Sequence, residues 1–370
     1  MSEPTIGQPR RVVADLPSYR PGKGAEQAEA EHGISNAIKL ASNENPDVPL
    51  DPIVAAVAAA AAGSNRYPDH RASDLRQAIA DRLGVAVDQV TVGNGSSGLL
   101  NQMIVAYVDP GDEVLYPWRS FEAYPVFTRW MDGRSVTVPL TATLEYDGDA
   151  LIGAITERTR LLFLATPNNP TGVATTTTEL ASIIERVPEH VLVVVDEAYR
   201  EFVHPRFGDP VTELLPRFAN VVVTRTFSKA HGLAGLRVGY AVGDPLAIAT
   251  IDKTLLPFAV NSLAQAAALA AIEHEPEIAA RVRTIVAERS RVEQSLARAG
   301  WKLPDHQGNF VWLASGEATD SVALELERRG VVVRPFSGDG VRVTVGSAAE
   351  NDRFLSTLDE LTVAGIATPR

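Results

Sequence analysis

Short apolar runs alternate with longer helical patterns along the middle of the chain. Several runs are apolar at consecutive positions, which is typical of strands buried on both faces of a largely parallel sheet. Helical patterns between the runs can cover both faces of such a sheet, so the sequence predicts an α/β layer fold. The runs that we interpret as strands cover residues 90–92, 113–116, 135–139, 161–165, 191–195, 221–224 and 238–242.

The pattern changes at about Asn261. An Ala-rich helical stretch runs to residue 271, and a charged helical stretch covers residues 278–299. Strands and helices then alternate to the last residues, which predicts a smaller α+β domain. Its later segments are expected strands at residues 310–313, 331–334 and 341–345, and expected helices at residues 321–329 and from Ala348 onward.

These changes predict how the chain divides into domains. Residues 1–40 are rich in Pro and Gly and show no clear periodicity. We expect them to form an N-terminal arm and part of the small domain. Residues 41–260 are expected to form the large domain, and residues 261–370 the small C-terminal domain.

Composition narrows the classes of partner and chemistry. With 34 Lys and Arg residues against 46 Asp and Glu residues, the formal net charge is −12, which disfavours nucleic acid and anionic membranes as partners. The chain contains no cysteine, which excludes a disulfide framework, thiol catalysis and a Cys-ligated metal site. We see neither a signal-peptide pattern nor an apolar run of roughly 18 residues, and therefore expect a cytoplasmic protein without a membrane span.

Polar segments follow several of the expected strands. In open α/β sheets, ligands bind outside the carboxyl ends of the strands, so each segment lies where a site is expected. The segments are Gly-Asn-Gly-Ser-Ser at residues 93–97, Asn-Asn-Pro-Thr-Gly at 168–172, Asp-Glu-Ala-Tyr at 196–199 and Thr-Phe-Ser-Lys at 226–229.

Each segment also has a purely structural interpretation when it is taken alone. Glycines and Asn-Pro are common in turns, Asp196 can cap a strand end, and a lysine after a strand is usually solvated. However, Asp196 follows a run that must be deeply buried, where a carboxylate is costly unless a cation pairs with it. Lys229 is followed by a glycine-rich stretch that ends at Arg237, which resembles a second anion cradle beside that at residues 93–97.

Two anion cradles, a buried carboxylate, an amide donor and an amine together fit pyridoxal 5′-phosphate. The lysine would form an imine, and the aspartate would keep the ring nitrogen protonated so that the ring accepts electrons. Other site classes fit less well, because nucleotide-binding loops do not occur where they are needed and no His pair has metal-ligand spacing. The nucleophile elbow of Ser-His-Asp hydrolases is also absent.

With these segments in this order, the sequence resembles the fold type I pyridoxal-phosphate aminotransferases over nearly its whole length. Within them it is similar to the branch of histidinol-phosphate and aromatic amino acid aminotransferases, and most of all to the actinobacterial aromatic (phenylalanine) enzymes. The resemblance implies a large, mixed, mostly parallel seven-stranded sheet with helices on both faces, plus a smaller α+β domain, in a homodimer. It rests on residues 41–46, 66–68, 168–172, 196–199, 228–229, 235–237, 309–310 and 342–346.

The resemblance also implies roles for individual residues. Lys229 would bind the cofactor covalently and later move the substrate proton, while Asp196 would pair with the ring nitrogen. Phe121 would stack on the ring, where many relatives carry Tyr. The other residues implied to bind the cofactor are Asn169 and Tyr199 at the ring hydroxyl, and Gly95, Ser96, Ser97, Thr226, Ser228, Arg237 and the partner subunit's Tyr67 at the phosphate.

The substrate end is less sharply defined. By the resemblance, Arg342 would bind the substrate carboxylate with its planar fork, and Tyr19, Asn43 and Arg334 would line the same end. The expected reaction is transamination of aromatic amino acids with 2-oxoglutarate as acceptor, in two half-reactions. Metal ions have no expected role, and the expected partners are small-molecule substrates, namely amino acids and keto acids, and a second copy of the chain.

Alternatives to this substrate stay open. A phosphate monoester carries more charge than a carboxylate and would need extra donors, yet residues 335–341 contain no Lys or Arg and include Asp339. This favours aromatic amino acids over histidinol phosphate, although Tyr19 with Lys23 could supply the missing donors. A pyridoxal-phosphate decarboxylase is a further alternative. A non-catalytic regulator is disfavoured, because we recognise no helix-turn-helix extension.

Overall fold

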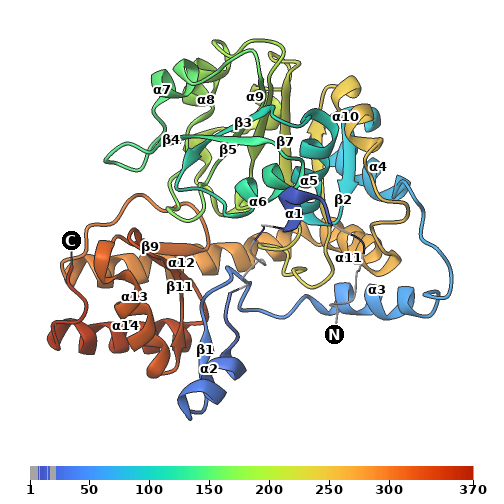
Figure 1. Cartoon of the computed structure of the whole chain (residues 1–370). Coiled ribbons are helices and arrows are strands. Elements are labelled where there is room, and N and C mark those ends of the chain that lie inside the picture. The colour runs from blue at the N-terminus through green and yellow to red at the C-terminus, as the bar shows by residue number, and fades with distance from the viewer. Residues whose placement is uncertain (1–6, 8, 15, 17–21, 370) are drawn as a thin grey trace, which may run out of the picture.

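The computed structural model describes residues 7, 9–14, 16 and 22–369 (Figure 1). Its main feature is a seven-stranded sheet in the order β2-β8-β7-β6-β5-β3-β4. Strand β8 runs antiparallel to both of its neighbours, and the other pairings within this sheet are parallel. The strands are β2 (Val90–Gly93), β3 (Glu113–Trp118), β4 (Arg134–Pro139), β5 (Thr159–Ala165), β6 (Leu192–Asp196), β7 (Val221–Thr226) and β8 (Gly239–Gly243). Each lies on a run that the sequence predicts as a strand, so the expected large, mixed sheet is confirmed.

Helices cover both faces of this sheet, as the consecutive apolar residues require. In β6, Val193 and Val195 join one buried apolar cluster, whereas Leu192 and Val194 join a second cluster on the opposite face. The helices of this part are α3 (Asp51–Ala61), α4 (Ser73–Leu83), α5 (Gly95–Tyr107), α6 (Ala123–Trp130), α7 (Gly148–Gly153), α8 (Thr177–Ile184), α9 (Pro210–Glu213), α10 (Pro245–Asp252) and α11 (Ser262–Glu273). Short 3-10 helices are η1 (Val87–Gln89), η2 (Arg200–Phe202) and η3 (Pro205–Phe207).

A smaller lobe is formed mainly by the carboxyl-terminal part of the chain. It contains the three-stranded antiparallel sheet β11-β12-β9 and the pair β1-β10, in which β1 comes from the N-terminal segment. Its strands are β1 (Ile38–Lys39), β9 (Phe310–Leu313), β10 (Val331–Val332), β11 (Arg334–Phe336) and β12 (Gly340–Thr344). Its helices are α2 (Ala25–His32), η4 (Gly316–Ala318), α13 (Thr319–Arg328) and α14 (Ala348–Val363). The expected smaller α+β part is therefore present.

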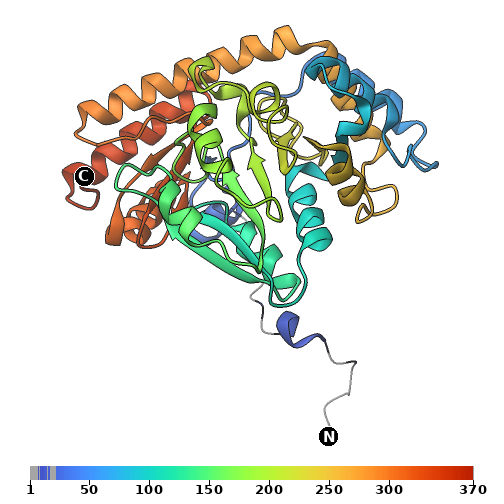
Figure 2. The same ribbon diagram turned by 90° about the horizontal axis from the view of Figure 1, so that it is seen from above.

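The long helix α12 (Glu275–Arg298) extends along both lobes, as Figure 2 shows from above. The short helix α1 (Arg11–Ala14) lies next to α6 at the edge of the main body, and its Val12 is buried. Among the described helices, none is both long and apolar enough to cross a membrane. The division of the chain at residues 40 and 260 stays a prediction.

One expected strand is wrong in detail. Residues 331–334 form not one strand but parts of two, because β10 pairs in parallel with β1 and β11 pairs antiparallel with β12. Val333 lies between them, buried like the valines before it. The chain therefore passes from one small sheet to another without any polar or turn residue to mark the change.

Candidate active site

The ends of five strands of the large sheet meet beside one cavity of about 250 Å³. Register places Gly93, Gly239 and Thr226 side by side, and likewise Ala165, Asp196 and Thr224. Strands far apart in sequence therefore deliver their following segments to one place, as the α/β pattern predicts. The predicted site residues that line this cavity are Ser96, Ser97, Phe121, Asn169, Asp196, Tyr199, Thr226, Ser228, Lys229, Arg237, Arg334 and Arg342.

One end of the cavity is a cradle for an anion. Helix α5 begins there, and its N-cap Asn94 makes no side-chain capping bond, so N–H groups of the first turn stay available to a ligand. Gly95 has φ +72°, and a Cβ at this position would lie 2.5 Å from Arg237 Nη2. The Arg237 guanidinium lies 3.4 Å from Ser228 Oγ and 3.5 Å from Ser97 Oγ. Backbone donors, hydroxyls and a cation thus converge as a phosphate group requires.

Lys229 reaches the middle of the cavity from the loop after β7. Its Nζ donates a hydrogen bond to the Ser42 carbonyl oxygen at 3.1 Å. Burial, reinforced by the charge of Arg342, lowers the pKa of this amine from 10.5 to about 7. At neutral pH a large fraction of the amine is therefore uncharged and nucleophilic, unlike a solvated lysine.

Asp196 ends β6 and lines the same cavity, with its side chain almost fully buried. Burial raises the pKa of the Asp196 carboxyl, although Tyr124 and Thr224 act in the other direction by donating hydrogen bonds at 2.9 and 3.2 Å. The carboxylate is thus held in place with no cation among the ion pairs of the described residues. A cationic group of a ligand beside Asp196 would offset the cost of burying this carboxylate.

Tyr124 is a residue of the site that the sequence reasoning missed. It is fully buried at the start of α6, stacks on Phe163 with ring centroids 4.7 Å apart, and donates its O–H to Asp196. Its only sequence signal is its position three residues after Phe121, and that signal is too weak to assign a role. Tyr124 fixes the orientation of the Asp196 carboxylate.

Asn169 and Arg342 meet at the side of the cavity that faces the smaller lobe. The Arg342 guanidinium donates to Asn169 Oδ1 and, at 2.7 Å, to the Ala41 carbonyl oxygen. Tyr199 lies beside them and accepts a hydrogen bond from Asn43 Nδ2 at 2.8 Å. Asn43 itself is buried behind Tyr199 and does not line the cavity, so its direct contact with substrate stays a prediction.

Arg334 approaches the cavity from β11 and forms an ion pair with Glu122, with Nη2 2.8 Å from Oε2. Glu122 also lines the cavity, and the sequence reasoning assigned it no role. Nearby, Arg119 is paired with Asp339. The negative charge of Asp339 is therefore offset by Arg119, and Arg119 does not line the cavity.

Other predicted residues lie elsewhere. Gly95 borders the cradle without lining the cavity, and Tyr19 falls outside the described residues. Tyr67 is 81% exposed and does not line this chain's cavity; its ring stacks on Phe258 with centroids 4.4 Å apart. Such exposure is what a residue offered to another subunit would show, and the role of Tyr67 at the partner's phosphate stays a prediction.

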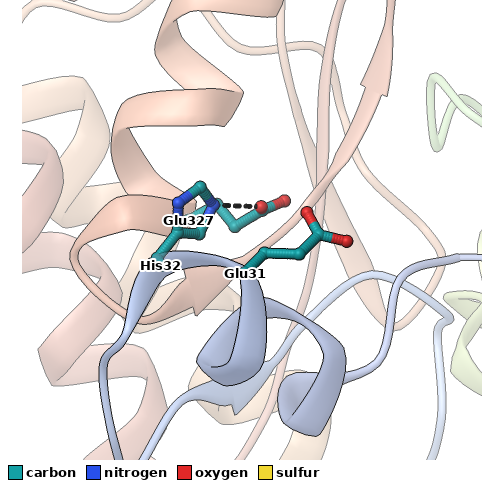
Figure 3. A group of neighbouring side chains, drawn as sticks. All are labelled: Glu31, His32 and Glu327. Atoms are coloured by element: carbon teal, nitrogen blue, oxygen red, sulfur yellow. Dashed lines mark hydrogen bonds and ion pairs between the residues drawn. The ribbon is translucent and has the colours of Figure 1, made fainter.

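Lys23 lies in a separate group of charged side chains with Glu31, His32 and Glu327 (Figure 3 shows the last three). His32 Nε2 lies 2.6 Å from Glu327 Oε1, and Lys23 Nζ forms ion pairs with both glutamates. A lysine ammonium thus already lies where a metal ion would compete for the same oxygens, so we assign no metal there. The group links α2 to α13, and Lys23 is committed to it and does not line the cavity.

Comparison with known proteins agrees with this geometry. Residues 35–358 match the family Aminotransferase class I and II. The chain belongs to this family. An aromatic amino acid aminotransferase of Streptomyces coelicolor is 48% identical over 97% of the chain and 99% of the relative, and one of Thermobifida fusca is 48% identical over 96% and 98%. The histidinol-phosphate aminotransferase of Sinorhizobium meliloti, solved with pyridoxal 5′-phosphate, is 28% identical with a TM-score of 0.90, covering 97% of this chain and 99% of that one.

The residues of this aminotransferase fit the pyridoxal phosphate that the S. meliloti structure contains. The cradle at α5 suits the phosphate, because adding a Cβ to Gly95 would fill the space beside Arg237. Lys229 offers an amine with a lowered pKa, and Asp196 offers a buried carboxylate that no cation pairs with among the described ion pairs. The arrangement can therefore bind the phosphate, hold a cationic ring nitrogen and move a proton at a carbon between them.

Proposed function

We propose that the protein transfers amino groups from aromatic amino acids to 2-oxoglutarate with pyridoxal 5′-phosphate as cofactor. The cofactor and the reaction class follow from the family and from the cavity that brings Lys229, Asp196 and the α5 cradle together. The substrate class is supported by the curated relatives at 45–48% identity that are named aromatic amino acid aminotransferases.

When bound, pyridoxal phosphate supplies an electron sink that stabilises negative charge on the substrate carbon. The chain supplies the groups around it. Ser96, Ser228 and Arg237 would hold the phosphate, and Asp196 the ring nitrogen, with Phe121 against one ring face. The Lys229 amine would take the proton from the substrate Cα and return it to the other reacting carbon, because its lowered pKa lets it both accept and release a proton near pH 7.

Arg342 would bind the substrate carboxylate, because its guanidinium is buried, rigidly held by Asn169 and the Ala41 carbonyl, and forked for two parallel hydrogen bonds. Such binding by Arg342 argues against a decarboxylase. A decarboxylase releases the substrate carboxylate, whereas Arg342 would hold and orient it. Release of carbon dioxide from phenylalanine would support the decarboxylase instead. A substrate-binding role for Tyr19 and a cytoplasmic location stay predictions from the sequence.

Substrate preference provides a direct test. We expect kcat/KM with 2-oxoglutarate to be at least about tenfold higher for phenylalanine and tyrosine than for histidinol phosphate, a difference of roughly 1.4 kcal/mol in transition-state binding. The measurement is steady-state kinetics of the three donors with the same enzyme preparation. A kcat/KM that is tenfold higher for histidinol phosphate than for phenylalanine and tyrosine would overturn the aromatic assignment and favour the histidinol-phosphate alternative.

We also propose a homodimer with shared sites. Exposed apolar side chains accompany Tyr67: Phe258, which stacks on it, is 40% exposed, and Leu256, two residues earlier in the chain, is 68% exposed. A second copy would bury them and could bring each Tyr67 to the partner's phosphate cradle. The family resemblance assigns Tyr67 this role.

Mixing two variants, one inactive and one strongly impaired, tests this sharing. Lys229→Ala removes the amine, and Tyr67→Ala should lower activity by about tenfold or more through a lost hydrogen bond to a charged group. Co-refolding the two should restore about a quarter of wild-type activity, because one site of each mixed dimer has both residues. Light scattering should give the mass of two chains. A fully active monomer, or no recovery on mixing, would contradict the shared site.

A further inference from the structure

Tyr199 lines the cavity, and its hydroxyl group has one hydrogen-bond partner among the described residues. The hydroxyl oxygen accepts a hydrogen bond from Asn43 Nδ2 at 2.8 Å. Burial raises the pKa of Tyr199 above its usual value of 10, so the phenol keeps its proton at neutral pH. Tyr199 therefore carries a proton that no group in the described part of the chain accepts.

Thr344 fixes which end of the Asn43 amide faces Tyr199. Its Oγ1 accepts from the backbone N–H of Asn43 at 2.9 Å and donates to Asn43 Oδ1 at 3.2 Å. If the amide were turned over, its NH2 group would face Thr344, and the Thr344 hydroxyl proton would have no acceptor among the described residues. Both side chains are almost fully buried, so leaving this proton without an acceptor would be costly. The NH2 group of Asn43 therefore faces Tyr199.

The backbone around Asn43 holds the amide in this place. Its φ of +52° lies in the left-handed region, which Asn adopts more readily than most residues. The Asn43 carbonyl oxygen accepts from Asn309 Nδ2 at 3.2 Å. The backbone N–H of Thr344 donates to the Leu40 carbonyl oxygen at 2.9 Å, which ties β12 to the segment that carries Asn43. The direction of the hydrogen bond to Tyr199 is thus determined by contacts outside the cavity.

We propose that Asn43 is a positioning residue that makes Tyr199 a hydrogen-bond donor toward the cavity. Because the hydroxyl oxygen of Tyr199 accepts from an NH2 group, its own proton has to point elsewhere, and Tyr199 lines the cavity. The inference rests on the proposed function and on the predicted place of Tyr199 at the ring hydroxyl of pyridoxal phosphate. A donor at that place favours the ionised form of the ring hydroxyl. Asn43, which the sequence places at the substrate, thereby acts on the cofactor through Tyr199.

Other polar groups of the site do not take this proton. Lys229 Nζ lies 5.8 Å from the centroid of the Tyr199 ring and donates to the Ser42 carbonyl oxygen. The Asp196 carboxylate accepts from two other hydroxyl groups. The Tyr199 proton is therefore available to an oxygen of a ligand.

Asn43→Asp tests the proposal, because it replaces the NH2 group by an oxygen while keeping the side-chain shape. Tyr199 would then donate to the introduced carboxylate, and the cavity would lose its donor. The readout is the Kd of the cofactor-free protein for pyridoxal 5′-phosphate and for 3-deoxypyridoxal 5′-phosphate, in which hydrogen replaces the ring hydroxyl. We expect Asn43→Asp to weaken binding of pyridoxal phosphate about tenfold relative to the deoxy analogue, as the loss of a hydrogen bond to a charged group predicts. A general disturbance of the site would weaken both probes alike.

Tyr199→Phe separates this hydrogen bond from the charge that Asn43→Asp introduces. In the Tyr199→Phe background, Asn43→Asp should change the Kd ratio by less than about twofold, because the hydroxyl group through which Asn43 acts is gone. A tenfold effect that persists in this background would show that the charge acts directly and would contradict the proposal.

Thr344→Val is a second variant that adds no charge. It removes the hydroxyl group that fixes the Asn43 amide, so the amide can turn and accept the Tyr199 proton. We expect the Kd ratio to shift about threefold in the same direction as in Asn43→Asp. An unchanged ratio would show that the orientation of the amide does not matter.

Asn36→Asp is the matched control, because it makes the same change at an exposed residue outside the cavity that has a similar φ of +58°. It should leave the Kd ratio within about twofold of wild type. Equal shifts in the two Asn→Asp variants, or an unchanged ratio in Asn43→Asp, would overturn the role of Asn43. A wild type that binds pyridoxal phosphate but does not transaminate phenylalanine would instead refute the proposed function, and the Kd ratios would still decide the role of Asn43.

Discussion

Replacing Lys229 by Ala should abolish transamination while leaving the fold intact. The amine is the group that takes and returns the substrate proton, and general acid-base catalysis of this kind contributes about 10²–10⁴-fold in rate. Folding should survive, because the variant gives up a single-donor contact of the amine with the Ser42 carbonyl oxygen. In addition, removing a buried amine whose pKa burial has lowered relieves a desolvation cost. Steady-state kinetics and thermal unfolding measure the two effects.

Chemical labelling identifies the residue independently of turnover. Borohydride reduction of the wild type with pyridoxal phosphate should attach the cofactor to Lys229, as peptide mass spectrometry would show, and Lys229→Ala should remain unlabelled. Lys302→Ala, at an exposed lysine outside the cavity, is the matched control and should label and turn over like the wild type. Labelling at another lysine in the wild type would contradict the assignment.

The lowered pKa of Lys229 predicts that the uptake of pyridoxal phosphate depends on pH. Because burial lowers this pKa to about 7, the uncharged amine increases as pH rises through 7 and is nearly complete by about pH 8. The rate at which the cofactor-free protein takes up pyridoxal phosphate should therefore rise through this range and then level off. A rate still rising steeply toward pH 10 would indicate an ordinary, solvated lysine.

The large sheet could be predicted from the sequence because its strands are buried on both faces. In β6, successive side chains such as Val193 and Val194 enter opposite apolar clusters, so a continuous apolar run is the direct consequence of the fold. The same rule failed in the smaller lobe. Residues 331–334 are also apolar before Arg334, but there the chain changes from one sheet to another, and the change depends on partner strands that a local pattern does not report.

The cavity could be predicted to the extent that strand ends determine it. Asp196 ends a strand, Asn169 and Lys229 follow strands, and parallel strands bring their carboxyl ends together. Tyr124 and Glu122 were not predicted, because their partners Asp196 and Arg334 lie 72 and 212 residues away in sequence. Their roles come from contacts across the fold, and no local motif marks them.

Replacing Asp196 by Asn should lower kcat by roughly 10²-fold, since breaking a buried charge pair costs about 3 kcal/mol or more and each 1.36 kcal/mol is tenfold in rate. Tyr124 and Thr224 donate to different oxygens of the carboxylate, so the single amide oxygen can keep one of these bonds. The amide NH2 can donate to the other hydroxyl, whose oxygen can also accept, so the geometry should persist. What is lost is the negative charge that would keep the ring nitrogen of the cofactor protonated. Asp359→Asn, at an exposed aspartate on α14, is the matched control and should retain full activity.

Stability separates this electrostatic role of Asp196 from a structural one. Burial raises the pKa of the Asp196 carboxyl, so the folded, cofactor-free protein disfavours its ionised form, and at pH 7 this lowers the free energy of unfolding. The Asp196→Asn variant carries no such cost, because a neutral amide needs no counter-ion. The Tm of the cofactor-free variant should therefore equal or exceed that of the wild type, while kcat of the loaded enzyme falls. If Asp196 were only a strand cap, the Tm would fall and kcat would stay near that of the wild type.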